Sequence, residues 1–238
     1  MARDTVATGL DVAQATRQLR ETVLREARPF HERTVLAAES FRQTEAEPFR
    51  ILRAARATTH ILEKMPVRIR PGELLVGWHP STHPDEAMQR AIQEATDYLR
   101  TQNYWVSASE GHMAPDYETI LWMGLGRIVK RIEGLTAALE PTAPDTPEKR
   151  AFYEAARTSL EALQGFIRRY ADLARRMAEE TDDDRWRQEL SDIAHLCDHL
   201  ATEPARTFRE AIQLAWFVFL SVCLEAGVSH HCFGPGRI

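Results

Sequence analysis

Apolar residues recur at intervals of three and four positions along most of this sequence, a spacing that places them on one face of an α-helix. Prolines and capping residues divide the pattern into separate helices. The predicted helices are two within 11–47 that separate near Pro29, and then 48–65, 84–102, 115–135, 148–180, 184–200 and 211–226. The chain is therefore expected to be mainly α-helical.

One stretch departs from the helical period. Residues 67–78 hold two short runs rich in Val, Ile and Leu on either side of Pro71 and Gly72, a dipeptide that favours a tight turn. This pattern predicts a short strand pair or one bent strand.

Residues 140–147 contain three prolines and no apolar anchor, so they are predicted to form a linker between two helical parts, 1–139 and 148–238. The last stretch, 227–238, is a glycine-rich loop that leads to no further element. We therefore expect residues 1–238 to form part of a larger domain, truncated at the C-terminal end.

Two local patterns mark features of single helices. Thr207 and Glu210 have the spacing of a capping box at the start of a segment that is almost entirely apolar and is expected to be buried. Gly124 and Gly126 fall inside a helical pattern, so they are not interpreted as a phosphate-binding loop.

Composition and charge narrow the class of protein. Thirty basic residues stand against 35 acidic ones, for a net charge of -5, and no cluster of Lys and Arg indicates a nucleic-acid groove or a membrane-binding patch. The longest apolar run, 211–224, is interrupted by Gln213 and is too short to cross a bilayer. Three cysteines without a signal-like start favour a reducing cytoplasm.

Two groups of His and Cys residues are candidates for a metal site or a catalytic site. His195 and His199 share a helix face and suit a metal, but Cys197 lies off that face among apolar residues, which favours a core thiol. The histidines of 78–83 are likewise not interpreted as metal ligands. A nucleophilic Cys232 beside a histidine base has nothing to orient the base, which favours a solvent loop or an interior turn. We predict no metal site.

His112 precedes a helix that should begin near Pro115, with Asp116 favouring the positive end of its dipole. A lone histidine in this position is more often a cap or a surface residue than a ligand. Its spacing alone leaves the role open.

Several segments, taken together and in order, resemble the N-terminal part of the pyruvate formate-lyase-like glycyl radical enzymes, in the branch of radical lyases and dehydratases. The matching segments are 32–45, 53–56 with 61–62, 69–77, 111–117, 169–174 with 177–178, 187–190 with 193–194, 204–213 and 236–237.

The resemblance implies a ten-stranded α/β barrel of two half-barrels, to which this chain would contribute the N-terminal helical portion and the short strand pair. It also implies anaerobic chemistry in which a glycyl radical, installed by a radical S-adenosylmethionine activating enzyme, generates a thiyl radical that removes a substrate hydrogen. The complete enzyme would be a homodimer, and a downstream polypeptide would supply the barrel and the glycyl domain.

The sequence departs from the family at the reactive residues. An Arg-Val-x-Gly-Tyr motif around the radical glycine is absent, and Cys223-Leu-Glu225 matches the thiyl Cys-x-Glu spacing only inside an apolar helix and far too early in the chain. The thiyl role is therefore not assigned to Cys223. The polypeptide by itself is predicted to be inactive.

The resemblance gives two residues a role. The positions of His112 and Tyr104 line the substrate site in related dehydratases and lyases, and a histidine favours a small hydroxylated or anionic substrate where a carboxylate would suit a cation. The alternative function is a non-catalytic helical module that binds a protein partner through exposed apolar faces.

Overall fold

The computed structural model describes residues 9–26, 31–77, 84–104 and 115–226. This part of the chain is helical and contains no strand. Its helices are α1 (Gly9–Glu26), α2 (His31–Gln43), α3 (Arg50–Lys64), α4 (Glu86–Thr101), α5 (Tyr117–Ala137), α6 (Thr146–Glu180), α7 (Asp184–Leu200) and α8 (Phe208–Ala226). The predicted mainly α-helical chain is confirmed.

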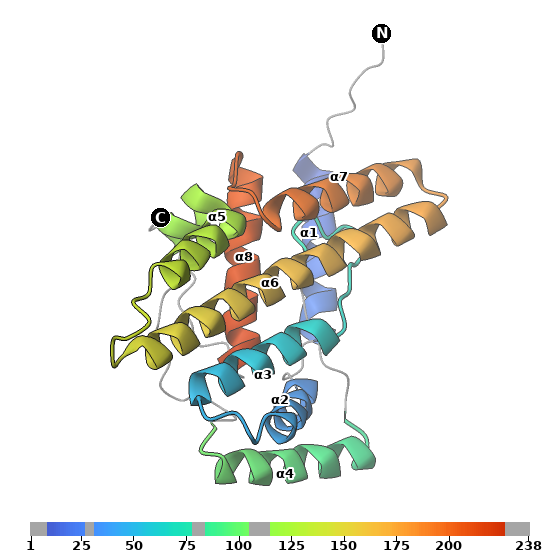
Figure 1. The fold of residues 1–238 in the computed structure, drawn as a ribbon. Coiled ribbons are helices and arrows are strands. Elements are labelled where there is room, and N and C mark those ends of the chain that lie inside the picture. Colours follow the sequence, from blue (N-terminus) through green and yellow to red (C-terminus); the bar gives the residue numbers. More distant parts are fainter. Residues whose placement is uncertain (1–8, 27–30, 78–83, 105–114, 227–238) are drawn as a thin grey trace.

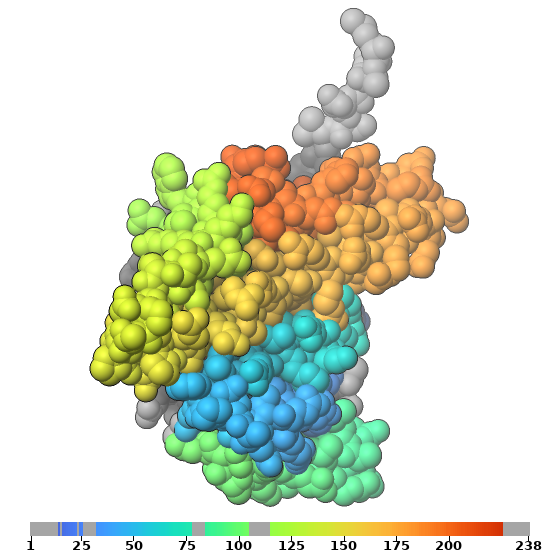
Figure 2. Space-filling model, viewed as in Figure 1, coloured from blue at the N-terminus to red at the C-terminus, as the bar shows by residue number. Residues whose placement is uncertain are grey.

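The central element is α6, whose 35 residues give it a length of about 53 Å. Figure 1 shows α6 running diagonally through the molecule, with α3 on one side and α7 on the other, and α8 crossing it. On the face drawn in Figure 2, the atoms of α6 form a band between those of α3 and those of α5 and α7. Small buried residues on α6, including Ala151, Ala155 and Ala171, allow the neighbouring helices to approach it closely.

An aromatic cluster fixes the crossing of α6 and α8. The ring of Tyr170 lies 5.3 Å from that of Phe166 in an edge-to-face arrangement, and 5.3 Å from that of Phe217 on α8. All three side chains are buried. Core residues such as Leu125 and Leu163 come from both sides of the segment predicted as a linker, 140–147, whose last two residues begin α6, so the chain before and after it contributes to one continuous core.

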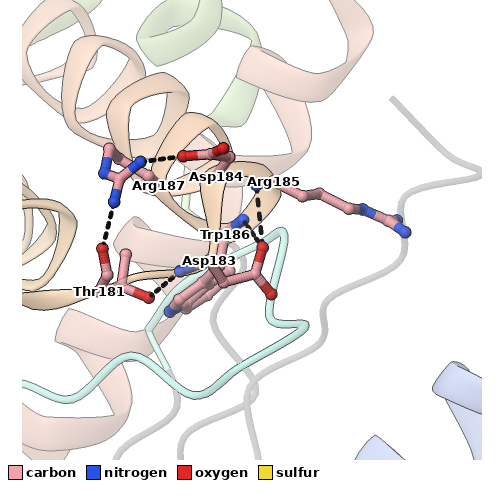
Figure 3. A network of polar contacts seen from close by, with 6 residues as sticks. All are labelled: Thr181, Asp183, Asp184, Arg185, Trp186 and Arg187. Atoms are coloured by element: carbon pink, nitrogen blue, oxygen red, sulfur yellow. Dashed lines mark hydrogen bonds and ion pairs between the residues drawn. The ribbon is translucent and has the colours of Figure 1, made fainter.

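The turn between α6 and α7 shows how polar residues end and start the helices. Asp183 caps α7, and its carboxylate accepts hydrogen bonds from the main-chain N–H groups of Arg185 and Trp186 at 2.9 and 3.1 Å (Figure 3). Arg187 pairs with Asp184 and donates to the carbonyl of Thr181. An aspartate cap therefore marks the start of α7, close to the start predicted for the helix 184–200.

The predicted strand pair at 67–78 is wrong for its described residues, 67–77. The Pro71-Gly72 turn is present, because Glu73 N–H donates to the carbonyl of Arg70 at 3.0 Å and Gly72 has a φ of +82°. The chain on either side of the turn is not paired as strands. Instead, the amide side chain of Gln213 on α8 accepts from Val76 N–H at 2.8 Å and donates to the Val76 carbonyl at 2.7 Å.

Helix α5 is interrupted where the sequence suggested a continuous helix. Gly124 has a φ of +69° and a ψ of 159°, so the helical path breaks there. A Cβ atom at this position would lie 2.5 Å from the main chain of Glu203 and Pro204, in the turn between α7 and α8. Gly126 N–H donates to the Thr202 carbonyl at 2.8 Å, which fixes α5 against the same turn.

At the start of α8, Thr207 and Glu210 form one of the two expected capping bonds. Glu210 N–H donates to the Thr207 hydroxyl at 3.2 Å, as predicted. The Glu210 carboxylate, however, accepts from Arg206 N–H at 2.6 Å rather than from the N–H of Thr207. Within the described residues, no helix is both long and apolar enough to cross a membrane.

Candidate functional site

Tyr104 lies in the turn that ends α4, two residues after the C-cap Gln102, at the last described position before residues 105–114. Its N–H donates to the carbonyl of Leu99 at 2.9 Å, while Asn103 N–H donates to Arg100 at 2.9 Å. Asn103 has a φ of +51°, so the end of α4 is a Schellman motif with an asparagine in the left-handed position. The main chain of Tyr104 is therefore fixed by the helix that precedes it.

Two arginines of α3 hold the end of α4 in place. Arg50 donates to the carbonyl of Asn103, and Arg53 donates to the Gln102 side chain at 3.0 Å and to the Phe41 carbonyl at 2.9 Å. These bonds connect the C-terminal end of α2, the first turns of α3 and the end of α4. The main chain immediately before Tyr104 is therefore held in a fixed position.

The side chain of Tyr104 points into the molecule and is 8% exposed. Its ring packs on Phe41 of α2, with ring centroids 4.5 Å apart. The guanidinium carbon of Arg33 lies 5.7 Å from the centre of the Tyr104 ring, and Arg33 Nη2 donates to the phenol oxygen at 3.4 Å. Tyr104 is thus an interior residue whose hydroxyl faces a positive charge.

Burial is the main cause of a raised pKa at Tyr104, and the nearby Glu225 carboxylate raises the pKa further. The positive charge of Arg33 acts in the opposite direction without reversing the result. The side chain is therefore a neutral phenol over the physiological range. A neutral phenol accepts and donates hydrogen bonds, which suits contact with a hydroxyl or an anionic oxygen.

Arg33 is the positively charged residue in contact with Tyr104, and its side chain is fully buried. Arg33 Nε donates to the carbonyl of Leu224 at 2.7 Å, and Nη2 donates to the carbonyl of Glu225. Both carbonyls belong to the last turn of α8, where a helix has unpaired carbonyl groups and a negative dipole end.

Sequence reasoning assigned no role to Arg33, although the segment 32–45 belongs to the family resemblance. A recognisable pattern was present, because Arg33, Ala37 and Phe41 are spaced four residues apart and share the buried face of α2. An arginine in line with core residues on a helix is a candidate for a buried polar contact.

The other predicted site residue, His112, lies outside the described residues. The helix that follows it is described, and its N-cap is Asp116, whose carboxylate accepts from Thr119 N–H at 3.1 Å. Bonding to Thr119 lowers the pKa of Asp116. The capping function considered for His112 is therefore performed by Asp116.

Both cysteines of the described chain are buried, and one of its histidines contacts a main-chain carbonyl. Burial raises the pKa of Cys197 to about 12 and that of Cys223 to about 11, so neither is a thiolate at neutral pH. His199 Nε2 lies 2.9 Å from the Pro204 carbonyl, and His195 is exposed. In the described segments, no three His, Cys, Asp or Glu residues are grouped to hold a metal ion. The loop with His230, His231 and Cys232 lies outside them.

A groove of about 360 Å³ lies between the first turns of α3 and α6. It is lined by Phe49, Leu52, Pro147 and Arg150 among others, and neither Arg33 nor Tyr104 contributes to it. The contacts around Tyr104 are therefore a separate feature of the fold.

Comparison with known families decides the class of protein. The pyruvate formate lyase-like family model matches residues 78–238, which include Tyr104, His112 and the end of α8. The chain belongs to the pyruvate formate lyase-like family. The family resemblance proposed from the ordered sequence segments is thereby confirmed.

Known members of this family are similar to the chain over most of its length. An isethionate sulfite-lyase of Desulfovibrio desulfuricans is 28% identical over 250 residues, covering 78% of this chain and 30% of that protein. The glycerol-bound, B12-independent glycerol dehydratase of Clostridium butyricum matches with a TM-score of 0.80 and 25% identity, covering 89% of this chain and 34% of that one.

A glycyl radical enzyme of Archaeoglobus fulgidus matches with a TM-score of 0.72 and 28% identity, over 87% of this chain and 34% of that one. The chain thus spans about a third of the length of these relatives. The fold described above corresponds to a helical segment of a glycyl radical enzyme.

Proposed function

We propose that this chain is the N-terminal part of a glycyl radical lyase or dehydratase that acts on a small hydroxylated or anionic substrate. The observation that carries the proposal is the family match over residues 78–238, because it includes both candidate substrate residues, Tyr104 and His112. Residues 1–139 and 148–238 would then be two helical parts of one incomplete domain, joined by 140–147.

The proposed substrate class follows from the chemistry of the two side chains. A histidine hydrogen-bonds a substrate hydroxyl and assists its departure as water by supplying a proton. The Tyr104 oxygen accepts a bond from Arg33, so its own proton is directed elsewhere and suits a substrate oxygen as acceptor. Isethionate and glycerol, named for two of the relatives, both carry hydroxyl groups.

In this proposal, the thiyl cysteine and the radical glycine lie outside these 238 residues. The sequence has no Arg-Val-x-Gly-Tyr motif, and Cys223, the one cysteine followed two residues later by a glutamate, is a buried thiol within α8. These residues do not fit the thiyl and glycyl roles. A downstream polypeptide would supply both groups, and a radical S-adenosylmethionine enzyme would install the glycyl radical in an anaerobic cytoplasm. The assembled enzyme would be a homodimer.

The test uses the chain combined with the downstream polypeptide and the activating enzyme under anaerobic conditions. Replacing His112 with Ala should lower kcat/KM by about 100-fold, the usual effect of losing a general acid. Tyr104→Phe removes only the phenol O–H and should raise KM with a smaller effect on kcat.

The matched control is His195→Ala, which removes an exposed histidine of α7 and should leave both kinetic constants unchanged. Unchanged affinity and turnover in His112→Ala would remove that residue from the substrate site. The same result for Tyr104→Phe would remove the phenol.

A further inference from the structure

The proposed function assigns no role to Arg33, which is one of the largest fully buried side chains in the described part of the chain. A charged guanidinium that is withdrawn from water is stable only when hydrogen-bond acceptors replace the lost hydration. The acceptors around Arg33 therefore indicate what the residue holds together.

Three of these acceptors come from segments far apart in the sequence. Two are the main-chain carbonyls of Leu224 and Glu225, and the third is the phenol oxygen of Tyr104. The separations from Arg33 are 191, 192 and 71 positions. A single side chain on the first turn of α2 thus connects the residue after α4 with the last turn of α8.

The character of each contact suits a permanent positive charge. The carbonyls at the end of α8 carry the negative end of the helix dipole, and the Tyr104 ring presents its electron-rich face to a cation. Arginine offers several N–H donors in one rigid plane, which lets it bind acceptors that lie in different directions. Lysine has the charge but lacks this planar arrangement.

We propose that Arg33 is a positioning residue that fixes the phenol of Tyr104 relative to the C-terminal end of α8. Arg33 donates to the Tyr104 oxygen and so sets the direction in which the phenol donates its own proton. This inference rests on the proposed function only where it treats Tyr104 as a substrate contact. The connection between Tyr104 and α8 is independent of catalysis.

The connection is tested by hydrogen exchange on the 238-residue chain, followed by mass spectrometry of the peptides covering 99–104 and 222–226. Arg33→Lys should accelerate amide exchange at 222–226 by about tenfold or more, because this segment loses its bonds to the guanidinium, and at 99–104 by a smaller factor, because only the Tyr104 side chain loses a bond there. Unchanged exchange in either peptide would overturn the inference.

Arg169→Lys is the matched control. Arg169 on α6 also donates to main-chain carbonyls at a helix end, that of Leu62 in the last turn of α3 and that of Met65 directly after it, at 2.5 and 2.7 Å. Its replacement should accelerate exchange near residues 62–65 and leave 222–226 unchanged. Faster exchange at 222–226 in this variant would show general loosening and would count against a specific effect of Arg33.

The unmodified chain provides a test if Arg33→Lys does not fold. Hydrogen exchange at increasing, non-denaturing urea concentrations reveals which segments open together. The peptides 99–104 and 222–226 should open in one step with the same dependence on urea. Separate openings with different dependences would contradict the proposed connection.

Kinetics in the assembled enzyme distinguish this inference from the proposed function. Arg33→Lys should raise KM at least several-fold more than it lowers kcat, because a misplaced phenol weakens substrate binding without removing a reacting group. Accelerated exchange combined with an unchanged KM would support the connection and overturn the substrate role of Tyr104.

Discussion

At the scale of single residues, long polar side chains satisfy main-chain groups that the helices leave unpaired. Arg33 binds the end of α8, Arg169 binds the end of α3, and Gln213 binds both main-chain groups of Val76. Helical spacing can place such a residue on a buried face, as it does for Arg33, but it does not identify the group to which the side chain bonds. The contacts of these side chains depend on which distant main-chain group lacks a hydrogen-bond partner, and the residue spacing within one helix does not reveal this.

Replacing Gln213 measures how much one buried side chain that bonds to the main chain contributes to the free energy of unfolding. Gln213→Leu keeps a similar volume but leaves the buried N–H and carbonyl of Val76 without their partner, so the free energy of unfolding should fall by about 2–4 kcal/mol. Urea denaturation measures the change. In Gln188→Leu the lost bond, to Asp192, is exposed, and the change should stay within about 0.5 kcal/mol. Equal losses in the two variants would contradict the assigned role.

At the scale of secondary structure, the sequence predicted the helices well where capping residues mark their starts. Asp85, Asp116 and Asp183 each accept a main-chain N–H bond at the start of α4, α5 and α7. The predicted strand pair failed because a β-favouring composition does not reveal that α8 supplies the partner of Val76. The break at Gly124 was missed because the apolar spacing continues through it.

Gly124 should be among the least replaceable positions of α5. Gly124→Ala combines a positive φ with a Cβ atom 2.5 Å from the main chain of the α7–α8 turn, so we expect a loss of about 3 kcal/mol in stability. Gly134→Ala lies later in the same helix, where a Cβ atom meets nothing within 4 Å, and should stabilise the chain by about 0.5–1 kcal/mol. Thermal unfolding of both variants provides the comparison, and a neutral Gly124→Ala would contradict the close approach.

The start of α8 should make stability depend on pH. Bonds from the side chain and main chain of Arg206 lower the pKa of Glu210 from its ordinary value of 4.5. Because the folded pKa lies below the unfolded one, the stabilisation is complete above pH 4.5 and is lost as the pH falls through the folded pKa. Glu210→Gln should therefore be less stable than the unmodified chain at pH 7, with a difference that shrinks below pH 4.5. A difference independent of pH would exclude this ion pair as its cause.

At the scale of the whole molecule, helices α2 to α8 share one main core but leave large aromatic side chains in solvent. Trp122 is 78% exposed and Phe208 is 81% exposed. Single exposed apolar side chains are common on protein surfaces, so these two residues do not by themselves define an interface. Under the proposed function, the remaining part of the enzyme would cover both side chains.

The family could be recognised from the sequence because its motifs are local and ordered, from the segment 32–45 to the segment 204–213. The internal contacts of the candidate site could not, since Tyr104, Arg33 and the end of α8 meet only in the folded chain. His112 lies outside the described residues, so its proposed role rests on the sequence alone. The Tyr104 contacts therefore carry the structural part of the proposal.

The central proposal is that these 238 residues are one part of a glycyl radical enzyme and that catalysis needs the part of the enzyme that carries the thiyl and glycyl residues. The most direct measurement is anaerobic turnover of glycerol and isethionate in the presence of a radical S-adenosylmethionine activating enzyme, with and without a polypeptide that carries the Cys-x-Glu and Arg-Val-x-Gly-Tyr motifs. We predict no product from the 238-residue chain alone and product from the combination. Product formed by the purified chain alone would contradict the claim.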